Sequence, residues 1–394
     1  MILLKIVLNV ELAHLKMQNN HKKIFIIAGE VSGDVLGGRI MQQMPEMQFV
    51  GIGGENMQRA GLKSIFPMSD LAVMGIIEVL AHARTLTARI NQTVNRIIAE
   101  RPDIVLTIDA PGFAKGVIKK LRKTSAGQKL IESGLQFHHV VAPQVWAWRS
   151  GRAKKYAKTF DKLYAFFEFE VPYFTKHGLD TVAVGHPIAN GLIGKKSRKS
   201  SEEKIISLIP GSRMSEVKRL LPVMHDTMDM LCRNGYTGYK FVIPVVETTE
   251  EYIKNEIKHW RFKPELVSAH DRYDLFKKTY IAIAASGTVS AELAMLHIPT
   301  IVVYKMNPIT TWIGKQIIKV EWVSLVNILL NRTVYPEILG NNVTPENILN
   351  AFQQLTIPSN REKIINDLTE ADKLWLPHGI DAAQTIAQHI QQLS

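Results

Sequence analysis

Asp109 stands directly after residues 103–108, an apolar run that is typical of a buried strand. A carboxylate at the carboxyl end of a central strand lies where open α/β sheets bind their ligands, and it can act as a general base. An aspartate followed by Ala110 and Pro111 is also typical of a helix start, in which the side chain caps free amides. Local sequence favours the cap, and both interpretations of Asp109 stay open.

The loop after residues 137–142 carries two tryptophans, Trp146 and Trp148, two positions apart. Exposing an indole without a binding role is costly, so the pair indicates a ligand-binding surface at the end of a strand. Gln144 and Trp146 are the candidate contacts on this loop. The alternative is that the rings fill a gap between a helix and the sheet, and the loop alone does not decide between the two.

A glycine-containing turn follows the strand-like residues 24–28 and leads into a helical pattern. Glycine lets the backbone approach a ligand closely, and the amides at a helix N-terminus attract anions. The candidate contacts in this turn are Glu30, Ser32, Gly33 and Asp34. The turn lacks the G-x-G-x-x-G pattern of dinucleotide-binding proteins, and Ser32 and Asp34 are equally typical of helix caps.

Two further turns of this kind end strand-like runs in the second half of the chain. Residues 205–209 lead into the turn 210–213, where an arginine suits a diphosphate. Residues 280–285 lead into the turn 286–288, followed one turn later by a carboxylate that could accept a ribose hydroxyl. Helix capping would explain either turn alone, but two phosphate-type turns at strand ends favour a nucleotide site. The candidate nucleotide contacts are Gly211, Ser212, Arg213, Ser286, Gly287, Thr288 and Glu292.

Residues 71–90 are strongly apolar, and their large side chains recur at helical spacing. Such a face could lie in the headgroup region of a membrane. Its candidate lipid-facing residues are Val73, Ile76, Ile77 and Leu80. An ordinary core helix shows the same pattern, and periodicity alone favours that alternative.

Strand-like runs alternate with longer amphipathic stretches, which is the pattern of βαβ units with parallel sheets. In the first half, the expected strands are 23–28, 48–52, 103–108, 137–142, 161–166 and 181–184. After a linker rich in Gly, Lys and Ser at 187–201, they restart at 204–209, 239–243, 280–285 and 299–303. This order predicts an α/β protein with two Rossmann-like domains that face each other across a cleft.

The two domains are expected at residues 21–190 and 191–370. Residues 371–394 are expected to form a C-terminal helix that could pack back on the first domain. Residues 1–20 precede the first convincing strand and form an N-terminal extension of doubtful role, because the fold does not need them.

The chain has 394 residues and a formal net charge of +12, which implies attraction to nucleic acid, anionic lipid or a phosphorylated small molecule. It has no basic tail and no nucleic-acid-binding motif, so nucleic acid ranks last. Cys232 is the single cysteine, which excludes a disulfide framework and fits the cytoplasm. No apolar run reaches the roughly 20 residues of a membrane-spanning helix. The histidines lack metal-site spacing, so neither a metal nor a cofactor is expected.

Seven motifs, taken together and in this order, closely resemble the lipid-A-disaccharide synthase family. They are AGEVSGD at 28–34, LAVMGIIEVL at 71–80, IDAPGF at 108–113, PQVWAWR at 143–149, GHP at 185–187, LIPGSR at 208–213 and ASGT at 285–288. The resemblance runs from Lys23 to the C-terminus.

The resemblance implies an inverting, metal-independent glycosyltransferase of the GT-B type. Such an enzyme joins UDP-2,3-diacylglucosamine to 2,3-diacylglucosamine 1-phosphate and releases UDP, in lipid A and lipopolysaccharide biosynthesis of a Gram-negative bacterium. Its first domain binds the acceptor and its second binds the UDP-sugar. It also implies peripheral association with the inner membrane from the cytoplasm, and it leaves open whether the protein is a homodimer.

Carried over to this chain, the resemblance makes Asp109 the base that takes the proton from the acceptor's 6-hydroxyl. Arg213 then contacts the departing UDP, and Asn327 and Glu337 belong to the donor side. Two positions depart from the family pattern. Val326 stands where the family usually has proline, and Gly340 stands where a glutamine commonly follows P-E-x-L, so a donor contact by that glutamine is in doubt.

Three alternatives stay open. Two are other enzymes on the same scaffold, a UDP-N-acetylglucosamine 2-epimerase and the transferase that makes the lipid-linked disaccharide of peptidoglycan. The third is a basic nucleotide- or RNA-binding protein. The apolar residues 71–86 and the tryptophan loop disfavour the epimerase, whose substrate has no acyl chains. The aromatic residues lie in loops rather than on a sheet face, which disfavours RNA binding.

Overall fold

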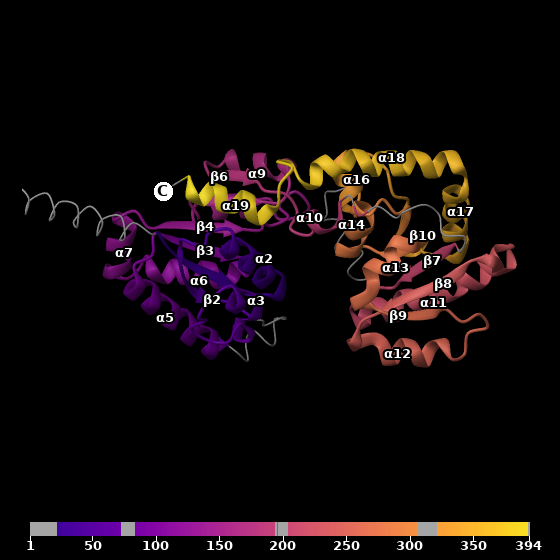
Figure 1. The fold of residues 1–394 in the computed structure, drawn as a ribbon, viewed down its shortest axis with the longest axis horizontal. Coiled ribbons are helices and arrows are strands. Elements are labelled where there is room, and N and C mark those ends of the chain that lie inside the picture. The colour runs from indigo at the N-terminus through magenta and orange to yellow at the C-terminus, as the bar shows by residue number, and fades with distance from the viewer. Residues whose placement is uncertain (1–21, 72–82, 194, 196–203, 306–320, 393–394) are drawn as a thin grey trace, which may run out of the picture. The chain divides into compact units, whose positions relative to one another are not determined.

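The computed structural model describes residues 22–71, 83–193, 195, 204–305 and 321–392. Contacts divide the chain into two compact units (Figure 1). The first contains residues 1–145, 150–187 and 380–394, and the second contains residues 146–149 and 188–379. After the loop that contributes 146–149, the chain therefore enters the second unit at 188 and returns to the first at 380.

A parallel sheet forms the centre of the first unit. Among the described residues it has six strands in the order β2-β1-β3-β4-β5-β6. They are β1 (Lys23–Ala28), β2 (Gln48–Ile52), β3 (Ile104–Ile108), β4 (Gln136–Val140), β5 (Lys162–Ala165) and β6 (Asp180–Ala183). The central strands β1 and β3 are apolar at nearly every position and buried, because a parallel sheet is covered on both faces.

Helices cover both faces of this sheet. They are α2 (Val31–Gln42), α3 (Glu55–Arg59), α5 (Ala83–Glu100), α6 (Pro111–Leu121), α7 (Ser125–Glu132), α8 (Arg152–Ala157), α9 (Val171–Thr175) and α19 (Ala382–Gln391). Alternation along β1 sends Phe25 and Ile27 into the core that contains α6 residues. Ile24 and Ile26 enter the opposite core, where residues of α2 and α19 pack together. The helix α19 therefore completes one face of the first unit's sheet.

Arg39 on α2 contacts both segments at which the chain crosses between the units. Its Nη1 donates a hydrogen bond of 2.7 Å to the carbonyl of Pro187, and its guanidinium forms an ion pair with Asp381. Asp381 also accepts a hydrogen bond of 2.7 Å from the amide of Ala383, at the start of α19. One side chain thus holds the outgoing and the returning segment against α2.

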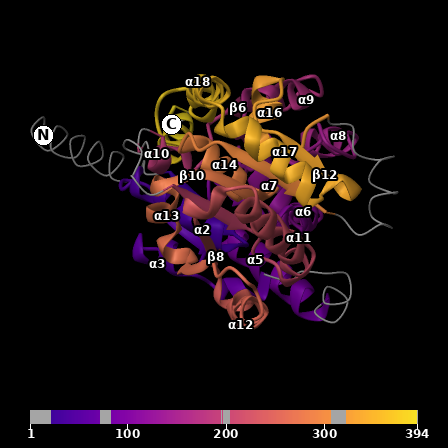
Figure 2. The ribbon, with the colours of Figure 1, turned by 90° about the vertical axis from the view of Figure 1, so that its right-hand side faces the viewer.

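A second parallel sheet forms the centre of the second unit. Its described strands are in the order β12-β11-β10-β7-β8-β9. They are β7 (Ile205–Ile209), β8 (Lys240–Val245), β9 (Glu265–Ser268), β10 (Thr279–Ala285), β11 (Thr300–Tyr304) and β12 (Glu337–Leu339). The helices are α10 (Ala189–Leu192), α11 (Met214–Arg233), α12 (Glu247–Ile257), α13 (Arg272–Lys278), α14 (Thr288–Met295), α16 (Leu325–Leu330), α17 (Pro345–Thr356) and α18 (Pro358–Trp375). The helices α11 and α17 pack side by side (Figure 2).

The predicted α/β class with two parallel sheets is confirmed. The strands β9 and β12 were not expected from the sequence; both lie at sheet edges and carry partly exposed side chains, so they lack an apolar run. Short 3-10 turns complete the described chain at Met68–Leu71, Glu168–Glu170, Tyr236–Gly238, Ala269–Asp271 and Gly340–Asn342.

None of the helices in the described ranges combines the length and the apolar character that crossing a bilayer requires. The four residues expected to face lipid lie outside the described residues: Val73, Ile76, Ile77 and Leu80.

Candidate functional site

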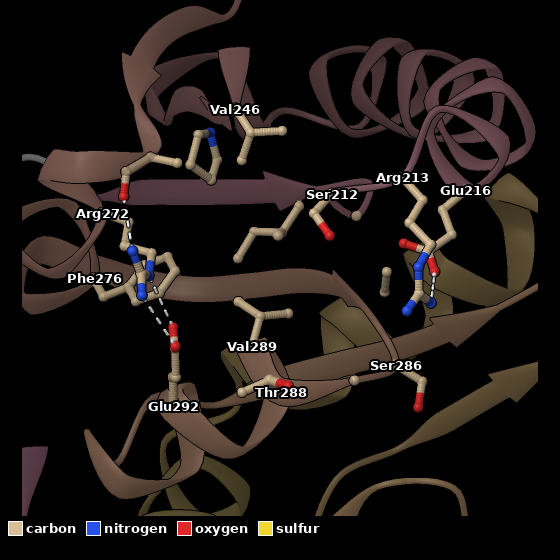
Figure 3. Close-up of a pocket in the computed structure, with 16 residues that line it drawn as sticks. Ser212, Arg213, Glu216, Val246, Arg272, Phe276, Ser286, Thr288, Val289 and Glu292 are labelled. Atoms are coloured by element: carbon tan, nitrogen blue, oxygen red, sulfur yellow. Dashed lines mark hydrogen bonds and ion pairs between the residues drawn. The ribbon is translucent and has the colours of Figure 1, made fainter. Parts of the chain in front are cut away.

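The second unit contains a cavity of about 410 Å³ at the carboxyl ends of β7 and β10 (Figure 3). These two strands are neighbours in the sheet, so the turns that follow them lie side by side. All seven residues expected to contact a nucleotide line this cavity: Gly211, Ser212, Arg213, Ser286, Gly287, Thr288 and Glu292. The volume is within the range of small-molecule sites, and the carboxyl ends of parallel strands are where α/β sheets bind ligands.

The turn after β7 requires glycine at position 211. Gly211 has φ +110°, a conformation that favours glycine, and a Cβ there would collide with the Glu216 side chain. Arg213 follows as the N-cap residue of α11, with its side chain 78% exposed and Nη1 3.2 Å from Oε1 of Glu216. The long helix α11 thus begins at the cavity with an arginine, and the positive end of its dipole favours an anion there.

The turn after β10 is open toward the cavity. Gly287 has φ +152°, and no atom lies within 4 Å of where its Cβ would be. The hydroxyl of Ser286 donates a hydrogen bond of 3.3 Å to the carbonyl of Val323, and the hydroxyl of Ser290 donates one of 2.7 Å to the carbonyl of Gly287. The backbone at this turn can therefore approach a ligand without interference from a side chain at Gly287.

Glu292 is held by an arginine that the sequence did not indicate. Arg272, at the start of α13, donates from Nε to Oε2 at 3.1 Å and from Nη2 to Oε1 at 3.2 Å. Tyr273 donates a third hydrogen bond of 3.2 Å to Oε1. Burial lowers the pKa of Arg272, but its pairing with Glu292 outweighs burial and raises it. A carboxylate has about four acceptor positions, so Glu292 keeps capacity for a further donor in the cavity.

Figure 3 shows the two arginines on opposite sides of the cavity, Arg213 beside Glu216 and Arg272 beside Glu292. Each guanidinium is paired with a glutamate, so neither arginine lies in the cavity as an isolated charge. Arg272 follows the edge strand β9 and a 3-10 turn that contains no glycine, and β9 is partly exposed, so no apolar run with a glycine turn marks this residue in the sequence.

The structure gives Asn327 a different role from the donor contact that we expected. The side chain is fully buried, and its amide donates to the carbonyl of Tyr335 and to Oε1 of Glu337, both at 2.9 Å. Its oxygen accepts from the amides of Val334 and Tyr335 at 2.9 and 2.8 Å. These contacts use both donors and both acceptor positions of the side chain. Asn327 therefore organises the chain before β12 and has no group left for a nucleotide.

Glu337 belongs to the same network. Its Oε2 accepts from the amide of Val323 and its Oε1 from the amide of Ser324, each at 2.9 Å. Because Val323 also accepts the hydrogen bond from Ser286, the network supports the turn after β10 from behind. Asn327 and Glu337 thus position the cavity wall without lining the cavity.

In the first unit, Asp109 lies at the carboxyl end of β3 in a strained backbone. It has φ +55° and the next residue, Ala110, has φ +46°. At the end of the neighbouring strand β4, Val141 has φ +84°, which is exceptional for a β-branched residue. Backbone strain of this kind costs free energy and is concentrated at functional sites.

The side chain of Asp109 does not cap α6. Its Oδ1 accepts a hydrogen bond of 2.9 Å from the amide of Ala110, which is itself the N-cap residue of that helix. A capping side chain would instead accept from the second or third amide of the helix. Among the described residues nothing donates to Oδ2, so this half-buried carboxylate keeps a free oxygen at the strand end.

Glu30 lies within electrostatic range of Asp109. Burial and then the negative charge of Asp109 raise the pKa of Glu30. The two residues follow β1 and β3, which are neighbours in the sheet. Gly29 allows this approach, because a Cβ there would collide with Cβ of Ala110. Ser32 is exposed on the first turn of α2, and Gly33 packs against the backbone of Ile108, where a Cβ would lie 3.3 Å from the carbonyl oxygen.

Asp34 is a structural residue, contrary to its expected place in the acceptor site. It is 2% exposed and accepts from the amides of Gly54 at 2.7 Å, Asn56 at 2.9 Å and Met57 at 3.1 Å. It therefore caps α3 rather than its own helix, and its oxygens are occupied. The alternative that Asp34 caps a helix was correct in kind but named the wrong helix.

On the tryptophan loop, Gln144 is exposed and its carbonyl accepts a hydrogen bond of 3.5 Å from Arg152. Trp146 is half-buried. Trp148 is 37% exposed, with the guanidinium of Arg149 4.9 Å from its ring centroid. The loop thus presents polar and aromatic groups to solvent, as a binding surface would, and its role stays a prediction.

Comparison with known proteins identifies the family. The family model described as lipid-A-disaccharide synthetase matches residues 24–389. The chain belongs to this family. A lipid-A-disaccharide synthase of Rhodospirillum centenum is 39% identical over 371 residues, which cover 90% of each chain. One of Gluconobacter oxydans is 38% identical over 386 residues, covering 94% of this chain and 91% of that protein.

Solved structures show the same fold at low sequence identity. The UDP-GlcNAc 2-epimerase of Neisseria meningitidis bound to UDP-GlcNAc has a TM-score of 0.59 at 11% identity, covering 94% of this chain and 100% of that one. MurG of Acinetobacter baumannii has a TM-score of 0.59 at 13% identity, covering 94% and 99%. Together with the two parallel sheets, these neighbours confirm the expected GT-B type of fold.

Proposed function

We propose that the protein is a glycosyltransferase that joins UDP-2,3-diacylglucosamine to the 6-hydroxyl of 2,3-diacylglucosamine 1-phosphate. The products are the lipid A disaccharide 1-phosphate and UDP. Membership of the lipid-A-disaccharide synthetase family over residues 24–389 is the observation that carries this proposal. The cavity with two phosphate-type turns in the second unit supports it independently, because a UDP-sugar presents a diphosphate and a ribose.

For the donor, we assign the diphosphate to Arg213 and the first amides of α11. The exposed guanidinium of Arg213 can leave Glu216 for a phosphate, since an exposed ion pair contributes little stability. Glu292 accepts a hydrogen bond from a ribose hydroxyl, and the two hydrogen bonds from Arg272 orient its carboxylate. As the glycosidic bond to UDP breaks, negative charge grows on the diphosphate, and these groups stabilise it.

For the acceptor, we assign the general base to Asp109. The free Oδ2 takes the proton from the 6-hydroxyl while the hydroxyl oxygen attacks the anomeric carbon from the side opposite UDP, which inverts the configuration. Glu30, whose pKa is raised by burial and by the charge of Asp109, supplies a second carboxyl group for hydrogen bonding to the acceptor sugar. Neither step uses a metal ion.

We further propose peripheral association with the cytoplasmic face of the bacterial inner membrane. The net charge of +12 attracts anionic headgroups, and the apolar residues of the segment 71–86 suit acyl chains.

One assay tests the proposal. Purified protein is incubated with both acylated substrates, and the products are separated by mass spectrometry. We expect equal amounts of UDP and disaccharide phosphate. Conversion of UDP-N-acetylglucosamine to its 2-epimer, with no disaccharide, would instead assign the protein to the epimerases that share its fold.

A further inference from the structure

Three cationic side chains lie within electrostatic range of one another on two different helices of the first unit. Lys115 lies on α6, the helix that starts directly after the Asp109 turn, and Arg152 and Lys155 lie on α8. Arg152 and Lys155 are three residues apart and so share one side of their helix. Lys115 is half-buried, with its Nζ 4.0 Å from the ring centroid of Tyr156 on α8. This contact joins the two helices and brings their charges together.

The ring of Tyr156 is a fixed platform for this ammonium. It packs against His139, with centroids 5.5 Å apart, and against Phe160, with centroids 5.3 Å apart. Burial lowers the pKa of His139 to about 3, so this histidine is neutral and adds no positive charge to the cluster. An ammonium over an aromatic face is held by the ring but not neutralised. The contact with Tyr156 therefore leaves the ammonium of Lys115 able to bind an anion.

Two of the three cations lack a carboxylate partner within the part of the chain that the structure describes. Neither Lys115 nor Lys155 forms an ion pair with a carboxylate anywhere in the described residues. Burial lowers the pKa of Lys115, and the positive charges of Arg152 and Lys155 lower it further. Holding the half-buried Lys115 near two like charges costs free energy, which an anion bound between them would offset.

Tyr156 also links the cluster to the candidate base. Asp109 lies close enough to Tyr156 for its charge to raise the pKa of the tyrosine hydroxyl, after the larger effect of burial and against that of Arg152. The first unit thus has a carboxylate for a hydroxyl proton and a cluster of cations, both within electrostatic range of Tyr156. The proposed acceptor carries both complementary groups, a hydroxyl and a phosphate monoester.

We propose that Lys115, Arg152 and Lys155 bind the 1-phosphate of the acylated glucosamine acceptor and so orient its 6-hydroxyl toward Asp109. This inference rests on the proposed function. A phosphate monoester carries more negative charge and more free oxygens than the phosphodiester of a membrane phospholipid, so three cationic groups suit it better.

The test compares two double variants with equal loss of charge on the same two helices. Lys115→Met with Lys155→Met removes two charges of the cluster, and methionine keeps the apolar stem against Tyr156. Lys119→Met with Lys154→Met is the matched control, because both of these lysines are exposed and outside the cluster. For each protein we measure KM for the acylated glucosamine 1-phosphate, KM for the UDP-sugar, and sedimentation with vesicles of phosphatidylethanolamine and phosphatidylglycerol.

We expect the cluster variant to raise the acceptor KM at least about tenfold, with the donor KM and vesicle binding equal to those of the control. An unchanged acceptor KM in the folded cluster variant would overturn the proposal. Equal losses of vesicle binding and of acceptor affinity in both variants would also overturn it, and would assign the lysines to general attraction to the membrane.

A second measurement separates this inference from the proposed reaction. Calorimetric titration with glucosamine 1-phosphate, and with glucosamine as the probe that lacks phosphate, reports on the cluster without any turnover. We expect heat of binding only for the phosphate, lost in the cluster variant and kept in the control. If the unaltered protein transfers sugar but binds both probes equally, only the phosphate site is wrong. If it binds the phosphate but makes no disaccharide, the proposed reaction is wrong and the site stands.

Discussion

Asp109→Asn tests the chemistry of the first unit with little change to its structure. Asparagine can accept the hydrogen bond of 2.9 Å that Oδ1 now accepts from Ala110. Asparagine also tolerates the left-handed conformation at φ +55°, whereas alanine would add strain there. The exchange weakens a charged hydrogen bond to a neutral one, at a cost of about 1 kcal/mol, and removes repulsion from Glu30. We therefore expect a folded protein with nearly unchanged stability.

The effect of Asp109→Asn on turnover should be larger than its effect on stability. A positioned general base contributes about 100- to 10,000-fold, which corresponds to about 3 to 5 kcal/mol of the activation free energy. The amide of asparagine cannot take the proton from the acceptor hydroxyl, so kcat should fall by that factor. UDP affinity should stay within a few-fold, because the proposed nucleotide cavity belongs to the second unit.

The assay is single-turnover transfer with radiolabelled acceptor, beside UDP titration and circular dichroism. Asp103→Asn is the matched control, since Asp103 precedes β3 and accepts a hydrogen bond of 2.8 Å from the amide of Lys23. A kcat within tenfold of the unaltered protein, in a folded Asp109→Asn protein, would refute the reasoning. The pKa of Glu30 gives a readout without turnover, because it should fall when the charge of Asp109 is removed but stay raised by burial.

The other expected outcomes concern the nucleotide cavity, metal dependence and the membrane. Arg213→Ala should weaken UDP binding about tenfold in calorimetry, because it removes one charged contact to the diphosphate, while Arg219→Ala on the same helix should not. Arg272→Met should lower the free energy of unfolding by about 2 kcal/mol in urea, since Glu292 loses its partner. The expected loss of unfolding free energy is smaller than for a fully buried ion pair, because the Arg272 side chain is 34% exposed. A chelator should not slow the transfer. Serine should replace three apolar residues together, Val73, Ile76 and Leu80. This triple variant should lose more of its sedimentation with vesicles than of its cooperative folding.

Each of these has an outcome that contradicts it. Unchanged UDP affinity in Arg213→Ala would mean that the turn after β7 does not bind the diphosphate. An unfolding midpoint of Arg272→Met equal to that of the unaltered protein would mean that Glu292 does not depend on its partner. Activity lost to the chelator and restored by Mg²⁺ would contradict the metal-free reaction. A triple serine variant that is unfolded by circular dichroism would assign the apolar segment to a core.

The sequence allowed prediction of features that depend on neighbouring residues. The central strands are apolar runs, and the turn after β7 carries its own signal in Gly211 and Arg213, so the nucleotide cavity could be predicted from these motifs. Contacts between distant segments carry no such signal. Arg272 reaches Glu292 across 20 residues, and Asp34 reaches Gly54 across 20 residues to cap a helix that is not its own.

The same limit applies to Asn327 and to the cationic cluster. Asn327 stands in a segment that the family resemblance associates with the donor, but only the fold shows that Val334 and Tyr335 occupy its side chain. Lys115 and Tyr156 are 41 positions apart, and their contact depends on how α6 and α8 pack. Sequence motifs identify residues at strand ends, whereas the charge around them is set by packing.

The position of α19 has a consequence for how the protein is made. This helix contributes Ala383, Ile386 and Ile390 to a core of the first unit, yet the ribosome synthesises it after the whole second unit. Early in translation, the first unit therefore exposes the apolar side chains of α2 against which α19 later packs, at a stage when N-terminal domains usually finish folding. Arg39 can form its ion pair with Asp381 only at the end of translation, because Asp381 lies near the end of the chain. The core of the first unit is thus completed only after residues 380–391 leave the exit tunnel, and until then the apolar surface that α19 buries stays open to aggregation.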